Sequence, residues 1–152
     1  MPYKVGKAVV YAILIWLIGF IWGSIVFMTP TLKSVRAIPY VSSNPAISFP
    51  ILLSWLIVAY LLARSYLKPA LNKADEGLKL GIVFSAVNIL LDMLVLVILL
   101  KADFNYFVFL TVWLGYLMLL VIPGLVGRSL QRRTPIKRNA SIRTAAVFNE
   151  IG

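Results

Sequence analysis

Four long apolar segments alternate with polar segments along the chain. The apolar segments cover residues 8–28, 49–67, 80–100 and 106–126. Each has the length of a transmembrane helix, because about 20 helical residues at ~1.5 Å each cross the ~30 Å hydrocarbon core of a bilayer. The pattern predicts an all-α integral membrane protein with four transmembrane helices in two antiparallel hairpins. We expect residues 1–127 to form this domain and residues 128–152 to form a basic cytoplasmic tail.

Composition agrees with a membrane protein and narrows the available chemistry. Apolar residues make up 61% of the 152 residues and charged residues only 13%, against about half and about a quarter in soluble domains. The chain has no Cys and no His. This excludes disulfides, thiolate nucleophiles, imidazole bases and the usual transition-metal sites. We therefore expect no cofactor and no metal.

Basic residues are divided unequally between the two sides that four crossings define. The two loops on one side hold Lys33, Arg36 and Lys101, and the other 12 of the 15 basic residues lie on the side of the termini. Loops rich in Lys and Arg remain in the cytoplasm. The pattern thus predicts cytoplasmic termini and a multi-pass protein of the cytoplasmic membrane.

The net charge of +10 also indicates a partner class. Basic side chains next to a membrane span are attracted to anionic lipids. The tail is therefore expected to contact anionic headgroups through Arg128, Arg132, Arg133, Lys137 and Arg138. Nucleic acid is not favoured as a partner, because the basic residues lack aromatic interleaving and a recognisable binding motif.

Two pairs of small residues are candidates for helix packing. Gly19 and Gly23 form a GxxxG pair in the first segment, and Ala59 and Ala63 form a similar pair in the second. Small residues at this spacing let a neighbouring backbone approach closely. We expect the glycine pair to contact another helix of the same chain, and contact with a second copy is the alternative.

The third segment carries a ladder of small and polar residues. Gly81, Ser85, Asn88 and Asp92 follow one another at steps of four, three and four residues. In a helix they lie on one face, and that face must contact protein or water rather than lipid. Asp92 is the only carboxylate well inside an apolar segment.

Depth in the membrane identifies candidate partners for Asp92. Counted from Leu80 at ~1.5 Å per residue, Asp92 lies ~18 Å from the inner boundary. Segments of similar depth contain Ser54, Tyr116, Trp113 and the region from Trp16 to Gly19. Arg64 lies too near the inner boundary to reach the acid. Because no basic residue matches its depth, Asp92 is expected to be neutral much of the time.

Three roles for this polar face remain open at the level of sequence. Asp92 could join helices as a structural pin, couple transport to protons or cations, or contact a lipid or protein ligand. Catalysis is not expected, because no paired carboxylates, activated nucleophile or metal cluster occurs at a suitable depth. We therefore predict a non-enzymatic structural, accessory or assembly protein. Its expected partners are membrane lipids and a larger membrane protein or a second copy of the chain.

Overall fold

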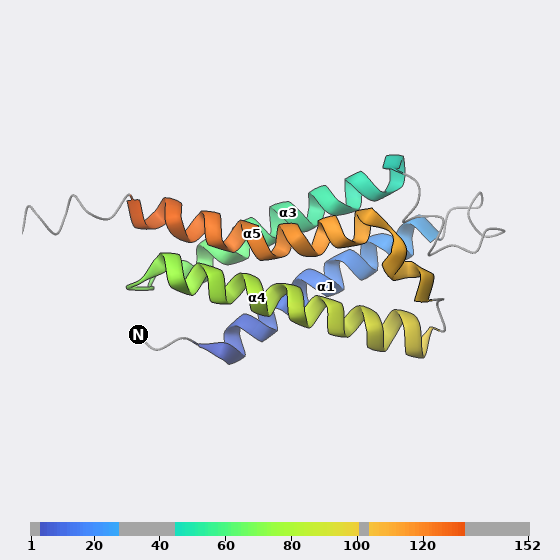
Figure 1. Ribbon diagram of the computed structural model, residues 1–152, viewed down its shortest axis with the longest axis horizontal. Coiled ribbons are helices and arrows are strands. Elements are labelled where there is room, and N and C mark those ends of the chain that lie inside the picture. Colours follow the sequence, from blue (N-terminus) through green and yellow to red (C-terminus); the bar gives the residue numbers. More distant parts are fainter. Residues whose placement is uncertain (1–3, 28–44, 101–103, 133–152) are drawn as a thin grey trace, which may run out of the picture.

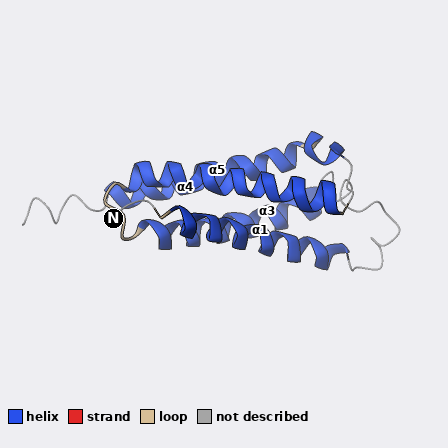
Figure 2. Cartoon of the chain, turned by 90° about the horizontal axis from the view of Figure 1, so that it is seen from below, coloured by secondary structure: helices blue, strands red, loops and turns tan. Residues whose placement is uncertain are grey.

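A computed structural model describes residues 4–27, 45–100 and 104–132 of the chain. The described part is all helical, and successive long helices run in alternating directions (Figure 1). In chain order the elements are α1 (Val5–Phe27), α3 (Pro45–Leu67), α4 (Lys73–Leu91), the π-helix η1 (Asp92–Leu99), the 3-10 helix η2 (Phe104–Val108) and α5 (Leu110–Arg132). Figure 2 shows two layers, one of α4 with α5 and one of α1 with α3.

Four helical spans are long and apolar enough to cross a membrane. They are Val5–Ile25, Ala46–Leu67, Lys73–Leu99 and Leu110–Arg132, the third combining α4 with η1. Large apolar side chains cover the outside of the bundle. Leu53, Ile82 and Leu125, for example, are each more than half exposed. An apolar surface of this extent is unfavourable in water and suits lipid, so the chain is a membrane protein.

The first three long helices begin earlier than the apolar pattern predicts. α1 begins at Val5 rather than residue 8, and α3 at Pro45 rather than residue 49. Proline suits the first position of a helix, where its missing N–H is not needed. α4 begins at Lys73 rather than residue 80. Its first turn is polar, and the side-chain oxygen of Gln131 accepts a hydrogen bond from the backbone N–H of Ala74 (3.0 Å).

The last helix differs from its predicted bounds at both ends. α5 begins at Leu110, because residues 104–108 form η2 instead of the first turn of a long helix. It continues past Pro123 to Arg132, so the predicted domain boundary at residue 127 falls within a helix. Residues 133–152 and most of the predicted loop at 29–48 lie outside the described residues.

Glycines bring the backbones of α4 and α5 into direct contact. A Cβ atom on Gly81 would lie 2.2 Å from the backbone oxygen of Leu120, and one on Gly77 would lie 2.5 Å from that of Pro123. On α5, a Cβ on Gly127 would lie 2.2 Å from the backbone oxygen of Lys73. These separations leave no room for a side chain. Close backbone approach of this kind is a general way to join helices in membranes.

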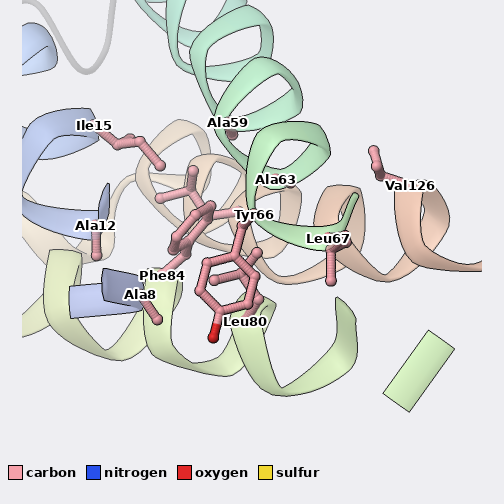
Figure 3. Packing of buried hydrophobic residues seen from close by; sticks show 11 residues of the cluster. Ala8, Ala12, Ile15, Ala59, Ala63, Tyr66, Leu67, Leu80, Phe84 and Val126 are labelled. Atoms are coloured by element: carbon pink, nitrogen blue, oxygen red, sulfur yellow. The ribbon is translucent and has the colours of Figure 1, made fainter. Parts of the chain in front are cut away.

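The apolar core lies between the helices in two clusters. The larger cluster joins all four long helices, and its side chains include Ile15, Ala59, Phe84 and Val126 (Figure 3). Small residues on α1 and α3 let the two layers meet: Ala8, Ala12, Ala59 and Ala63 are fully buried. A second, smaller cluster contains Tyr106, Val112 and Tyr116 and adjoins the acid of η1.

Candidate functional site

Asp92 is the first residue of η1 and one of the most deeply buried polar groups in the described part of the chain. Its side chain is 2% exposed. The indole Nε1 of Trp16 donates a hydrogen bond to its Oδ1 (2.7 Å). The hydroxyl of Tyr106 donates to Oδ2 (3.1 Å), and the hydroxyl of Tyr116 donates to the same oxygen. Three aromatic donors therefore surround this carboxylate.

The donors come from three different elements, so Asp92 connects four parts of the fold. Trp16 lies on α1, Tyr106 on η2 and Tyr116 on α5. η2 has the tight 3-10 form over its five residues, and this turn places Tyr106 within reach of an acid 14 residues earlier in the chain. We name these four side chains, Asp92, Trp16, Tyr106 and Tyr116, the Asp92 cluster.

Aromatic contacts hold the donor rings of the Asp92 cluster in place. Trp16 stacks on Phe20 with ring centroids 5.0 Å apart. Tyr106 meets the edge of Phe107 at 5.2 Å, and Tyr116 meets Trp113 at 5.9 Å. Stacked and edge-to-face pairs of this kind are preferred geometries that stabilise the positions of the rings. The donor side chains are therefore held in place by contacts that do not involve Asp92.

Asn88 lies one turn before Asp92 and is fully buried. Its amide Nδ2 donates to the backbone oxygens of Phe84 (2.8 Å) and Ala12 (3.2 Å), the second of which lies on α1. Two carbonyl acceptors on the same side fix the orientation of the amide, because only its nitrogen can donate. The amide oxygen Oδ1 has no hydrogen-bond partner. A buried acceptor without a partner is costly and therefore unusual in a native structure.

The other two residues of the predicted ladder face α5. Ser85 donates a hydrogen bond to the backbone oxygen of Tyr116 (2.8 Å), and Gly81 contacts the backbone at Leu120. Asn88 bonds to α1 as well as to its own helix. The ladder thus contacts protein on both sides of α4. Each of its four members joins α4 or η1 to a neighbouring helix.

Two of the partners predicted for Asp92 bond elsewhere. Ser54 donates to the backbone oxygen of Ile51 on its own helix (2.7 Å). The indole of Trp113 donates to the backbone oxygen of Phe107 (2.7 Å), and its side chain is half exposed. Depth alone could not distinguish these residues from Tyr116, because residues at equal depth can point in opposite directions around a helix. A bond from a serine hydroxyl to a backbone oxygen one turn earlier, as at Ser54, is common in helices.

The predicted packing pairs are placed as follows. A Cβ on Gly19 would overlap the indole of Trp55, so the first glycine contacts a helix of the same chain, whereas Gly23 is partly exposed. Ala59 and Ala63 are both fully buried in the larger core cluster. The same indole of Trp55 lies 3.2 Å from the position of a Cβ on Gly115. Its buried Nε1 has no hydrogen-bond partner.

Basic residues predicted to contact lipid lie only partly within the described chain. Arg128 and Arg132 are exposed on the last turns of α5. Arg133, Lys137 and Arg138 lie outside the described residues. Among residues 4–27, 45–100 and 104–132, no group of three or more acidic side chains could hold a metal ion.

Sequence reasoning missed Tyr106 and two glycines of the α4–α5 contact, Gly77 and Gly127. The apolar pattern places Tyr106 in the first turn of a long helix. In the structure this residue lies instead in the 3-10 helix η2. Gly77 and Gly81 do form a GxxxG pair in the sequence. That spacing is a usable signal, but Gly77 stands in a polar stretch that we expected to be a loop.

Comparison of the chain with protein-family models, with curated proteins and with solved structures finds no match.

The geometry of the Asp92 cluster indicates which of its atoms donate and which accept. Nε1 of tryptophan can only donate, so Oδ1 of Asp92 is an acceptor. Oδ2 accepts from both tyrosine hydroxyls, one for each of its two lone pairs. The cluster is a closed set of hydrogen bonds, in which no described Lys or Arg contacts the acid.

Proposed function

We propose that the chain is a multi-pass protein of the cytoplasmic membrane with a structural, accessory or assembly role and no enzymatic activity. In this proposal Asp92 is a pin that fixes α1, η2 and α5 around the end of α4. The observation that carries it is the closed hydrogen bonding of the acid: both carboxylate oxygens are taken by donors of the same chain, and the side chain is 2% exposed. Such a group is unavailable to a substrate or a partner helix.

The proposed topology has two antiparallel hairpins with both termini in the cytoplasm. The excess of Lys and Arg on the side of the termini supports it. The start of α1, next to Lys4 and Lys7, and the end of α5, with Arg128 and Arg132, lie at the same end of the bundle in Figure 1. Anionic lipids of the cytoplasmic leaflet are the proposed partners at that end.

A second candidate is coupling of transport to protons or cations. Two observations favour it. The backbone changes from α-helix to π-helix at Asp92, a change that is frequent at functional sites. The amide oxygen of Asn88, one turn away, is buried without a partner. A protonated Asp92 has a hydroxyl to donate, and Asn88 offers an acceptor on the same face.

Replacement of Asp92 by Asn separates the two candidates. Asparagine keeps the shape of the side chain but cannot titrate. If Asp92 is a pin, the variant loses about 1 kcal/mol of unfolding free energy in mixed micelles, the scale of one or two interhelical hydrogen bonds in a membrane. Vesicles containing the wild-type protein should then show no proton flux above empty vesicles, measured with an enclosed pH-sensitive dye.

The control is Asp75→Asn, the same change at an exposed acid in the first turn of α4. It should alter neither stability nor flux. A flux that the wild-type protein supports and Asp92→Asn abolishes, at unchanged stability, would overturn the structural role and favour coupling. An assembly role also requires that mild detergent extraction recovers a partner at fixed stoichiometry, and recovery of the chain alone would contradict that role.

A further inference from the structure

A second cluster of charged and aromatic side chains lies at the start of α1, far along that helix from Trp16. The ammonium of Lys7 lies 5.2 Å from the ring centroid of Tyr11 and 5.9 Å from that of Tyr66. The two rings meet edge to face, with centroids 6.4 Å apart. A lysine within about 6 Å of a ring face is attracted by the electrons of the ring. Lys7 is thus held by one tyrosine of its own helix and one of α3.

Hydrogen bonds fix this arrangement to the backbone. The hydroxyl of Tyr66 accepts from the backbone N–H of Lys4 (3.0 Å) and donates to the backbone oxygen of the same residue (3.2 Å). Tyr66 itself is 5% exposed and belongs to the larger core cluster. The hydroxyl of Tyr11 bonds to Ser65 and to Lys7. The start of α1 and the end of α3 are therefore joined around a positioned ammonium group.

Two exposed lysines bring positive charge to the start of α1. Lys4 immediately precedes the helix, and its backbone oxygen accepts from the backbone N–H of Ala8 (3.1 Å). Lys7 lies one turn further on. The carboxylate of Glu76 on α4 acts electrostatically on Tyr66. The two cations therefore lie where a membrane span begins, at Val5.

We propose that Lys4, Lys7, Tyr11 and Tyr66 form a binding site for the phosphate of an anionic phospholipid. The phosphates of a bilayer lie just outside the hydrocarbon core, at the depth of a span's first residues. A lysine ammonium has three N–H donors, and the contact with Tyr11 leaves others for phosphate oxygens. Tyrosines are favoured at this depth, with the ring toward the acyl chains and the hydroxyl toward the headgroups. Because its lysine is held in advance, the site loses less entropy on binding than a freely moving one.

This site is independent of the structural role proposed for Asp92, and it differs from the basic tail in being built on two helices. Attraction of the tail to anionic lipid depends on charge alone. In the lysine and tyrosine cluster two rings hold the ammonium of Lys7, and Tyr66 fixes the backbone of the second lysine, Lys4. It should therefore show saturable binding of a small number of lipid molecules rather than a diffuse preference.

The test uses the full chain in a mild detergent, titrated with phosphatidylglycerol or with phosphatidylcholine, and native mass spectrometry counts the bound lipids. Lys7→Gln should weaken binding of phosphatidylglycerol about fivefold, as expected for one basic group near an anionic lipid. The matched control is Arg64→Gln. It removes one exposed charge near the same end of α3, where the guanidinium of Arg64 donates to the hydroxyl of Tyr60 rather than to a member of the cluster. Its effect should be less than about twofold.

Lys7→Arg keeps the cation and its attraction to the rings, so it should retain binding if the geometry is as described. Equal losses of binding in Lys7→Gln and Arg64→Gln would overturn the site, because they would show attraction by charge in general. Equal binding of phosphatidylglycerol and phosphatidylcholine would also overturn it. Competition by inorganic phosphate at the same concentration as the lipid would show that the cluster binds a free anion, which contradicts the assignment to a lipid.

Discussion

Two regions of one helical span join it to its neighbours in different ways. At the start of α4, glycines place its backbone directly against α5, and no side chain lies between them. At the other end, where α4 becomes η1, bulky aromatic side chains reach across to one carboxylate. The comparison shows how a membrane bundle can combine van der Waals contact with hydrogen bonding. Both are needed, because lipid provides no hydrophobic force that drives helices together.

The two kinds of contact differ in what they tolerate. The glycine contact has no free space, so any added atom must displace a backbone. The hydrogen-bonded contact consists of separate side chains, and the loss of one donor leaves the others in place. We therefore expect substitutions at the glycines to have larger effects than the removal of single hydroxyl groups.

The largest effect is expected for Gly81→Ala. Its Cβ would lie 2.2 Å from the backbone oxygen of Leu120. Since α4 and α5 would have to separate, we expect the unfolding free energy to fall by about 3 kcal/mol, the upper end of the range for overpacking. Titration with sodium dodecyl sulfate in mixed micelles measures this value.

Gly124→Ala is the matched control for that experiment. This glycine lies on α5, and its added Cβ would have nothing within 4 Å. Alanine is a better helix former than glycine, so the control should be neutral or gain up to about 1 kcal/mol. An unfolding free energy of Gly81→Ala equal to that of Gly124→Ala would contradict the close backbone contact between α4 and α5.

A smaller effect is expected for Tyr116→Phe. This change removes one donor to Asp92 and leaves the ring in the smaller core cluster and against Trp113. The loss should be about 1 kcal/mol, within the range measured for interhelical hydrogen bonds in membranes. Tyr60→Phe is the control, because Tyr60 is exposed and, in the part of the chain that the structure describes, its hydroxyl bonds only to Arg64. Equal stability of the two variants would contradict a role for the Tyr116 hydroxyl.

The sequence contained enough information to predict four helical spans and to place Asp92 and Tyr116 at similar depth. Apolar length determines a span, and a step of ~1.5 Å per residue determines depth. The direction of each side chain around its helix depends on packing, and for this reason Ser54 and Trp113 could not be separated from Tyr116. The region from Trp16 to Gly19 had the right depth, but only the structure distinguishes the donor Trp16 from Gly19, which contacts Trp55.

Local backbone form was the least predictable feature. Apolar composition continues through Asp92–Leu99, so nothing in the pattern distinguishes the π-helix from the α-helix before it. The 3-10 turn at Phe104–Val108 is similarly hidden among aromatic residues that fit a long helix. Tyr106 reaches Asp92 only because of that turn, and it was therefore missed.

A double-mutant cycle between Asp92 and Tyr116 tests the central claim most directly. Asp92→Leu keeps a similar side-chain shape without hydrogen bonding, and Tyr116→Phe removes the donor. If the acid joins η1 to α5, the unfolding free energies of the single and double variants should give a coupling of about 0.6 to 1.7 kcal/mol. A coupling of zero, with all three variants folded, would contradict the role of Asp92 as a structural pin.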